Sequence, residues 1–163
     1  MGSPNKFTGL LRVFLMAALF SGEDATVIHP VNPIWPLGIV DPTPTRCQYS
    51  ETATFAYIEL TNCTQQPCLI STAATYQISP TFTPGYTANT MTYYLYLNYG
   101  TGSHNFGTMS FTEEYLAGNQ YKIVREILIP SELRGRSGYF LLMLVDSTAL
   151  IHISRCFNAT VAH

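Results

Sequence analysis

From residue 54 onward, the chain contains short runs in which apolar and polar side chains alternate. In residues 91–99, one set of alternate positions is Met91, Tyr93, Leu95 and Leu97, and the positions between them carry threonine, tyrosine and asparagine. Successive side chains of a β-strand point to opposite faces. This run therefore predicts a strand with one face in the core and a half-polar second face.

Further stretches are rich in β-branched and aromatic residues, which favour strands, and they cover residues 54–60, 74–79, 120–129, 138–145 and 150–161. In 120–129, Tyr121, Ile123, Ile127 and Ile129 oppose Lys122, Val124, Glu126 and Leu128. Segments rich in turn-forming residues separate the strands, at 79–89, 100–107, 116–119 and 130–138. No window predicts a capped amphipathic helix. The fold class predicted is all-β, an antiparallel sandwich of two sheets.

The start of the chain predicts export. Lys6 and Arg12 precede the apolar run VFLMAALF, residues 13–20, which small and acidic residues follow. This order is typical of a secretory signal peptide, and the run is far shorter than the ~20 apolar residues of a membrane span. We assign the signal peptide to residues 1–22, with cleavage between residues 21 and 25. The expected location is extracellular or in the lysosomal lumen.

Domain organisation follows from proline content and length. Five prolines fall within residues 29–45, and proline fixes φ and removes a backbone donor. We therefore expect an extended Pro-rich arm over residues 23–45 and one β-sandwich domain over residues 46–163.

Charge and composition narrow the partner. Without its first 22 residues the chain keeps 6 of its 8 basic and all 10 acidic residues, a net charge of −4. Nucleic-acid binding calls for clustered Lys and Arg, so no nucleic-acid partner is expected. The chain is 47% hydrophobic, with 11 Tyr and 9 Phe. This apolar surplus favours a cavity or an interface.

The four cysteines favour disulfides. In an exported chain an even number predicts two bridges, with three possible pairings. Cys63 and Cys68 are close enough in sequence to bridge a short loop, which leaves Cys47 for Cys156. The spacing does not match a zinc site or a redox Cys-x-x-Cys pair. No metal is expected.

Catalytic motifs are also missing from the sequence. It has neither a Gly-x-Ser-x-Gly elbow nor a His-Glu-x-x-His pair. Glu113 and Glu114 are adjacent on an expected loop, and His152 lies on an apolar strand, where a structural role is the more common one. We expect a protein that is not an enzyme and has no cofactor. Asn62 and Asn158 begin Asn-x-Thr triplets and are candidate glycosylation sites.

Several segments together are similar to one family. A first-strand cysteine is followed by CTQQPCLI, ATYQISPTFTP, YKIVREILIP and the closing LLMLVDSTALIHISRCFNATV. This order resembles the ML family of secreted lipid-recognition domains, over residues 45–161. Members include the lysosomal Niemann-Pick type C sterol carrier, the group-2 house dust mite allergens and the lipid-binding co-receptors of Toll-like receptors. Two features depart from the family: residues 106–119 contain no cysteine where many members have a third bridge, and the Pro-rich arm has no counterpart.

The resemblance implies an immunoglobulin-like sandwich with an apolar cavity between its sheets. It also implies the pairs Cys47–Cys156 and Cys63–Cys68. The ligand would be a lipid, sterol or fatty acid, and a membrane receptor or transporter protein is a further expected partner. Candidate ligand-binding residues come from the inward faces and, as a gate in the turn-rich segment, from Phe106, Met109 and Phe111. The inward-facing candidates are Ile58, Leu60, Ile78, Phe82, Tyr93, Leu95, Leu97, Tyr121, Ile123, Phe140 and Leu142.

Two functions remain open from the sequence. The first is a secreted carrier or presenter of a lipid. The second is an extracellular adhesion or innate-immune co-receptor module with a filled core, in which exposed tyrosines and the Pro-rich arm meet a protein, because Trp and Tyr are common at interfaces.

Overall fold

The structure is a computed structural model that describes residues 37–162. The expected signal peptide and the first part of the expected arm lie outside these residues. Within them, no helix has the length and apolar character needed to cross a membrane. Apart from the single 3-10 turn η1 (Ser131–Leu133), the named elements of the described chain are strands.

The first sheet has five strands. They are β1 (Leu37–Ile39), β3 (Thr54–Thr61), β5 (Thr75–Thr83), β8 (Tyr121–Lys122) and β9 (Arg125–Leu128). The order is β1-β3-β5, after which β8 and β9 pair with successive parts of β5, and every pair is antiparallel.

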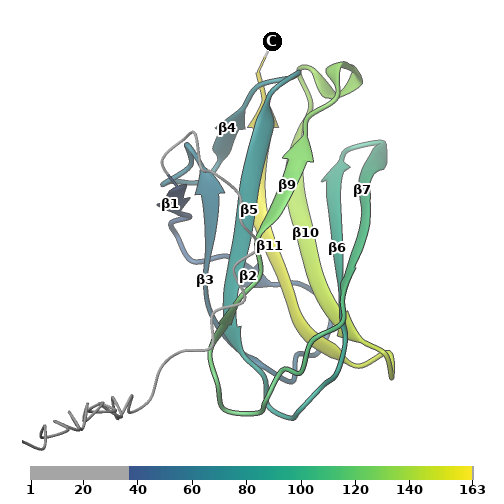
Figure 1. Cartoon of the computed structure of the whole chain (residues 1–163). Coiled ribbons are helices and arrows are strands. Elements are labelled where there is room, and N and C mark those ends of the chain that lie inside the picture. Colours follow the sequence, from purple (N-terminus) through teal and green to yellow (C-terminus); the bar gives the residue numbers. More distant parts are fainter. Residues whose placement is uncertain (1–36, 163) are drawn as a thin grey trace, which may run out of the picture.

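The second sheet has six strands. In spatial order they are β2 (Thr45–Arg46), β11 (Ile151–Val161), β10 (Ser137–Asp146), β6 (Met91–Tyr99) and β7 (Gly102–Phe111), and β4 (Cys68–Ile70) pairs with β11. Among the described pairs, β4 with β11 is parallel, which departs from the fully antiparallel sheets expected from the sequence. The strands of the two sheets lie in two layers, one in front of the other (Figure 1).

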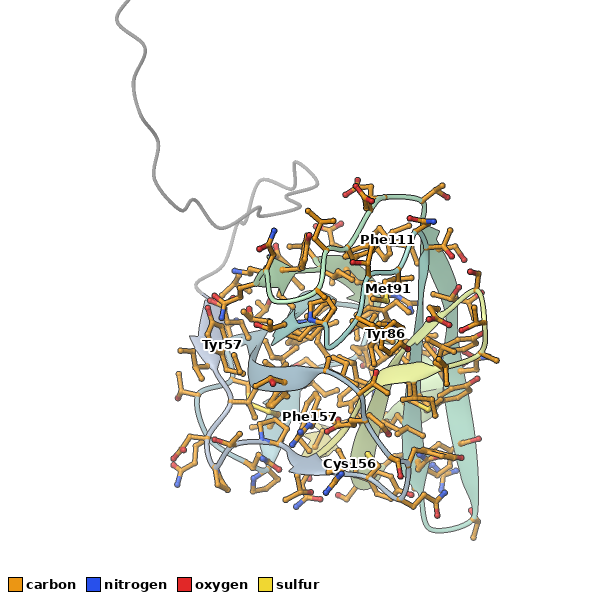
Figure 2. The ribbon with its side chains drawn as sticks, turned by 90° about the horizontal axis from the view of Figure 1, so that it is seen from below. Tyr57, Tyr86, Met91, Phe111, Cys156 and Phe157 are labelled. Atoms are coloured by element: carbon orange, nitrogen blue, oxygen red, sulfur yellow. A yellow bond between two sulfur atoms is a disulfide. The ribbon has the colours of Figure 1, made fainter. Side chains whose placement is uncertain are left out.

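The expected all-β, two-sheet sandwich is confirmed. One face of each long strand packs toward the other sheet, as the burial of alternate residues along β6 and β10 shows. Seen from below, the side chains fill the space between the layers, with Met91 and Phe157 among them (Figure 2). The core therefore lies between the sheets.

Several element boundaries differ from expectation because pairing overrides local preference. Residues 102–107, expected as a turn, belong to β7, which pairs with β6 along its length. β5 continues through Pro80 to Thr83, because Phe82 is fully buried and β3 and β8 pair on either side. The expected single strand 120–129 is divided into β8 and β9. Residues 37–39 of the expected arm form strand β1, and β2 (residues 45–46) lies where the expected arm meets the expected sandwich.

Both disulfides have the expected pairing, with Cα–Cα distances of 5.5 Å for Cys47–Cys156 and 5.4 Å for Cys63–Cys68. Cys63 follows β3 and donates its N–H to the carbonyl of Leu60, whereas Cys68 begins β4 of the other sheet. The short disulfide therefore links the two sheets. We call this side of the sandwich, at β3 and β4, the disulfide edge.

One carboxylate organises the turn between β10 and β11. Asp146 Oδ1 accepts hydrogen bonds from Thr148 N (2.8 Å), Thr148 Oγ1 (2.7 Å) and Leu150 N (3.1 Å), and its Oδ2 lies 3.4 Å from His152 Nε2. Burial by itself raises the pKa of Asp146, but these hydrogen bonds outweigh it and lower the pKa to about 2. His152 is fully buried, and burial lowers its pKa. Asp146 and His152 therefore stabilise the turn between β10 and β11.

We predict that removing the long disulfide costs more stability than removing the short one. The bridges close loops with sequence separations of 109 and 5 residues. Loop entropy gives about 4.7 kcal/mol for the first and about 2 kcal/mol for the second. Urea unfolding of the Cys47→Ala/Cys156→Ala and Cys63→Ala/Cys68→Ala pairs tests this, and the reverse order would contradict it.

We also predict acid sensitivity from Asp146. Its folded pKa lies below the unfolded value of 3.8, so the stabilisation is complete above that value and is lost as pH falls from about 4 to 2. The loss is about 2 kcal/mol. The free energy of unfolding against pH should lose this component in Asp146→Asn and keep it in Asp41→Asn, whose side chain is exposed. Parallel profiles for Asp146→Asn and the wild type would contradict the assignment.

Candidate ligand site between the two sheets

The structure brings most of the candidate residues together in one core. Twelve of the fourteen are buried, and the two others, Phe106 and Met109, lie on β7. Nine have an exposed fraction of 0% and belong to the packed core; these are Ile58, Leu60, Ile78, Phe82, Tyr93, Leu95, Leu97, Phe140 and Leu142. The side chains of the two sheets therefore close the interior at these positions.

Aromatic side chains form the centre of this core. The rings of Phe140 and Phe157 stack with centroids 5.1 Å apart, and Phe106 lies 5.8 Å from Phe140 on the other side. The centroid of the Tyr121 ring lies 6.4 Å from that of Phe82 and 5.1 Å from that of Tyr115. Such pairs stabilise a core beyond the area that they bury. The chain thus offers a continuous apolar interior from β7 to β5.

The three expected gate residues lie along the edge strand β7. Phe106 is partly buried against the core, Met109 is 40% exposed, and Phe111 is buried. They pair with β6, which places Met109 opposite Tyr93 and Phe111 opposite Met91. The segment expected to be turn-rich is therefore a strand here, and the role of the three residues as a gate stays a prediction.

Arg125 of β9 places a charged group in this interior. It is only 5% exposed, and its guanidinium carbon lies 5.2 Å from the centre of the Tyr93 ring. Nη1 donates to the Tyr93 carbonyl (3.4 Å), and Nη2 donates to the carbonyls of Phe106 (2.5 Å) and Gly107 (3.1 Å). The side chain therefore joins β9 to β6 and β7. We call this side of the sandwich the arginine edge.

A β-bulge in β7 presents these carbonyls to Arg125. Tyr94 pairs with Thr108 and Tyr96 with Asn105, so Phe106 and Gly107 both lie opposite Leu95. Gly107 has φ +85°, which glycine adopts readily, and its N–H donates a hydrogen bond to Asn105 Oδ1 at 2.8 Å. Because of the extra residue, the carbonyls of Phe106 and Gly107 are free to accept hydrogen bonds from the Arg125 guanidinium.

Burial shifts the ionisation of both polar groups at this edge. Burial lowers the pKa of Arg125 and raises that of Tyr93. Arg125 Nε and the Tyr93 hydroxyl are buried, and neither has a hydrogen-bond partner within the described part of the chain. A buried polar group without a partner costs stability, and a buried charge costs more. The arginine edge is therefore a place where the core departs from apolar packing.

The alternation in residues 120–129 already contained Arg125, although the sequence analysis did not select it. Tyr121, Ile123, Ile127 and Ile129 were assigned to the inward face, and Arg125 occupies the position between Ile123 and Ile127 on that face. A charged residue in the middle of an apolar face was the signal. It was missed because only apolar candidates were considered for the ligand site.

A separate pocket of about 500 Å³ lies outside the sandwich core. It is lined by Pro42, Thr43, Thr45, Cys47, Gln48, Tyr49, Gln66, Tyr139, Leu141, Cys156, Phe157 and Asn158. None of the fourteen candidates lines it. Among residues 37–162, no group of three or more His, Cys, Asp or Glu side chains could hold a metal ion.

We predict that the closed core behaves as a solid one. Leu95→Ala and Phe140→Ala should each lower the free energy of unfolding by about 2–5 kcal/mol, through lost burial and a new void. Leu128→Ala is the control, because Leu128 is 61% exposed, and its effect should stay within about 0.5 kcal/mol. Urea unfolding measures all three. Losses below about 1 kcal/mol at both core positions would show that the sheets are apart in solution.

The fold matches a solved protein. The structure is similar to the crystal structure of a Niemann-Pick type C2 protein from Japanese carpenter ant, with a TM-score of 0.64 and 12% sequence identity. The match covers 73% of this chain and 98% of that chain. No protein-family model matches the sequence, and no curated protein does. The shared feature is therefore the two-sheet fold, present over nearly the whole of the ant protein.

Proposed function

We propose that this protein is an exported, non-enzymatic lipid-binding protein of the ML type, which holds a lipid, sterol or fatty acid between its two sheets. The observation that carries the proposal is the match to the Niemann-Pick type C2 fold over 98% of that chain. Two disulfides are compatible with a secreted or lysosomal protein. A carrier of this kind needs no catalytic group, because it acts by removing apolar surface from water.

A ligand enters this closed core by separating the sheets. At the disulfide edge, Cys63–Cys68 links the sheets covalently, and β4 pairs with β11. At the arginine edge, the hydrogen bonds and ring contact of Arg125 connect β9 to β6 and β7. Non-covalent contacts break and re-form without chemistry. We therefore place the entrance at the arginine edge, between β7 and β9.

The energy of transfer is large enough for such an opening. Each buried CH₂ contributes about 0.8 kcal/mol, so a chain of about 16 carbons gains on the order of 12 kcal/mol. The ligand also replaces the apolar contacts that the separated sheets lose. The first apolar side chains that the ligand meets are Phe106, which is partly buried, and Met109, which is exposed.

Native mass spectrometry of the exported chain, purified from culture medium, tests the proposal. We expect one co-purifying lipid per chain, and after delipidation we expect one-to-one binding of a fluorescent fatty acid or a fluorescent sterol. A comparison variant is the Cys63→Ala/Cys68→Ala pair, which removes the covalent link between the sheets at the disulfide edge. Failure of every apolar probe to bind the folded wild type would refute the lipid function.

The second candidate is an adhesion or co-receptor module, whose expected filled core is compatible with the packed interior. In that case the outward tyrosines of β6, Tyr94 and Tyr96, which are partly exposed, would contact a protein partner. A membrane receptor or transporter is compatible with either function. Lipid binding by the folded wild type would rule out the filled-core module.

A further inference from the structure

We propose that Arg125 binds the charged head of the ligand, and that the ligand is a long-chain carboxylate rather than a neutral sterol. This inference rests on the proposed function. It concerns one side chain on the inward face of β9, in contact with the edge strand β7, and it assigns that side chain a role in selecting the ligand.

Arg125 is a buried cation that has no carboxylate partner among residues 37–162. The described carboxylates that are not exposed are engaged elsewhere: Glu51 with Arg155, Glu59 with Lys122 and Asp146 with its own turn and His152. The remaining described acids are exposed. Arg125 therefore has only neutral carbonyl groups and the face of Tyr93 to offset its charge. A charge buried in this way is expensive for a core that has no use for it.

The side of the guanidinium that carries Nε and Nη2 has the arrangement of donors that a carboxylate needs. Arg125 Nε is buried and has no partner, and the adjacent Nη2 bonds two backbone carbonyls. A carboxylate accepts two parallel bonds from neighbouring guanidinium nitrogens, and such charge-assisted bonds are about twice as strong as neutral ones. A ligand carboxylate can therefore take Nε and Nη2, displacing the carbonyls of Phe106 and Gly107. The same exchange releases β7 from β9.

Charge balance selects a carboxylate over other anions. One arginine and one carboxylate leave the interior neutral, whereas a phosphate monoester carries about −1.5 to −2 charges and would leave excess charge buried. A sterol or fatty alcohol would leave the arginine unpaired. The Tyr93 hydroxyl, buried without a partner on the ring that Arg125 covers, is an additional donor in the same interior.

The test compares matched amphiphiles on the delipidated full chain. Palmitate, hexadecanol, hexadecyl phosphate and cholesterol are titrated against the wild type, Arg125→Met and Arg125→Lys, with Arg134→Met as an exposed-arginine control. We expect the wild type and the control to bind palmitate about 10- to 100-fold more tightly than hexadecanol. Arg125→Met should bring this ratio to about one while hexadecanol still binds. Arg125→Lys, which keeps the charge but loses the two parallel bonds, should give an intermediate ratio.

Each outcome separates the two proposals. Equal affinity of the wild type for palmitate and hexadecanol, or preference for cholesterol or the phosphate, overturns the carboxylate inference and leaves the lipid function standing. An unchanged palmitate preference in Arg125→Met also overturns it and points to the separate pocket of about 500 Å³ described above. No binding of any amphiphile refutes both. Where Arg125→Met does not fold, as judged by urea unfolding, the wild-type ratio and Arg125→Lys decide.

Discussion

The contact between the two apolar sheet faces is the interaction on which the rest of this structure depends. Long strands such as β6 and β10 have one largely buried face, which packs into the shared core between the sheets. A two-stranded part of either sheet would leave this surface in water, so the layers are stable only together. The disulfides, the Asp146 turn and the bulge in β7 all act at the margins of this contact and fix how the two layers meet.

Arg125 departs from this apolar contact, and its position explains why the departure is tolerated. It lies where the edge strands β9 and β7 of the two sheets meet. At the bulge in β7 the strand ladder is interrupted, and backbone carbonyl groups there accept hydrogen bonds from Arg125. Those carbonyls lower the cost of the charge without neutralising it. A methionine of similar volume would remove the buried charge but would leave the carbonyls of Phe106 and Gly107 without this donor. The backbone bonds therefore explain how the charge is tolerated, and under the proposal above ligand recognition explains why it is there.

Most of the fold could be predicted from the sequence because the alternation of apolar residues reports directly which face is buried. Strand 91–99 has the predicted bounds, and twelve of the fourteen candidates are buried. β7 could not be predicted in this way, because an edge strand with glycines and an interrupted register gives no clear alternation, and its pairing with β6 decides its conformation. The parallel β4–β11 pair depends on a contact between segments about 90 residues apart, which no local pattern contains. The state of the interior was also beyond the sequence, since the same apolar residues line a cavity or fill it.

The closed interior and a carrier function are compatible because the two margins of the sandwich differ in kind. The Cys63–Cys68 bond at the disulfide edge keeps the sheets together at one side whatever fills the interior. The arginine edge depends on hydrogen bonds to backbone carbonyls, which a stronger acceptor can replace. Opening at that edge exposes apolar faces to water, so it is costly in the absence of a ligand, and a ligand that supplies both an apolar chain and a carboxylate offsets the two costs together. A neutral lipid offsets only the first, so under the two proposals above the arginine edge both closes the interior and selects the ligand.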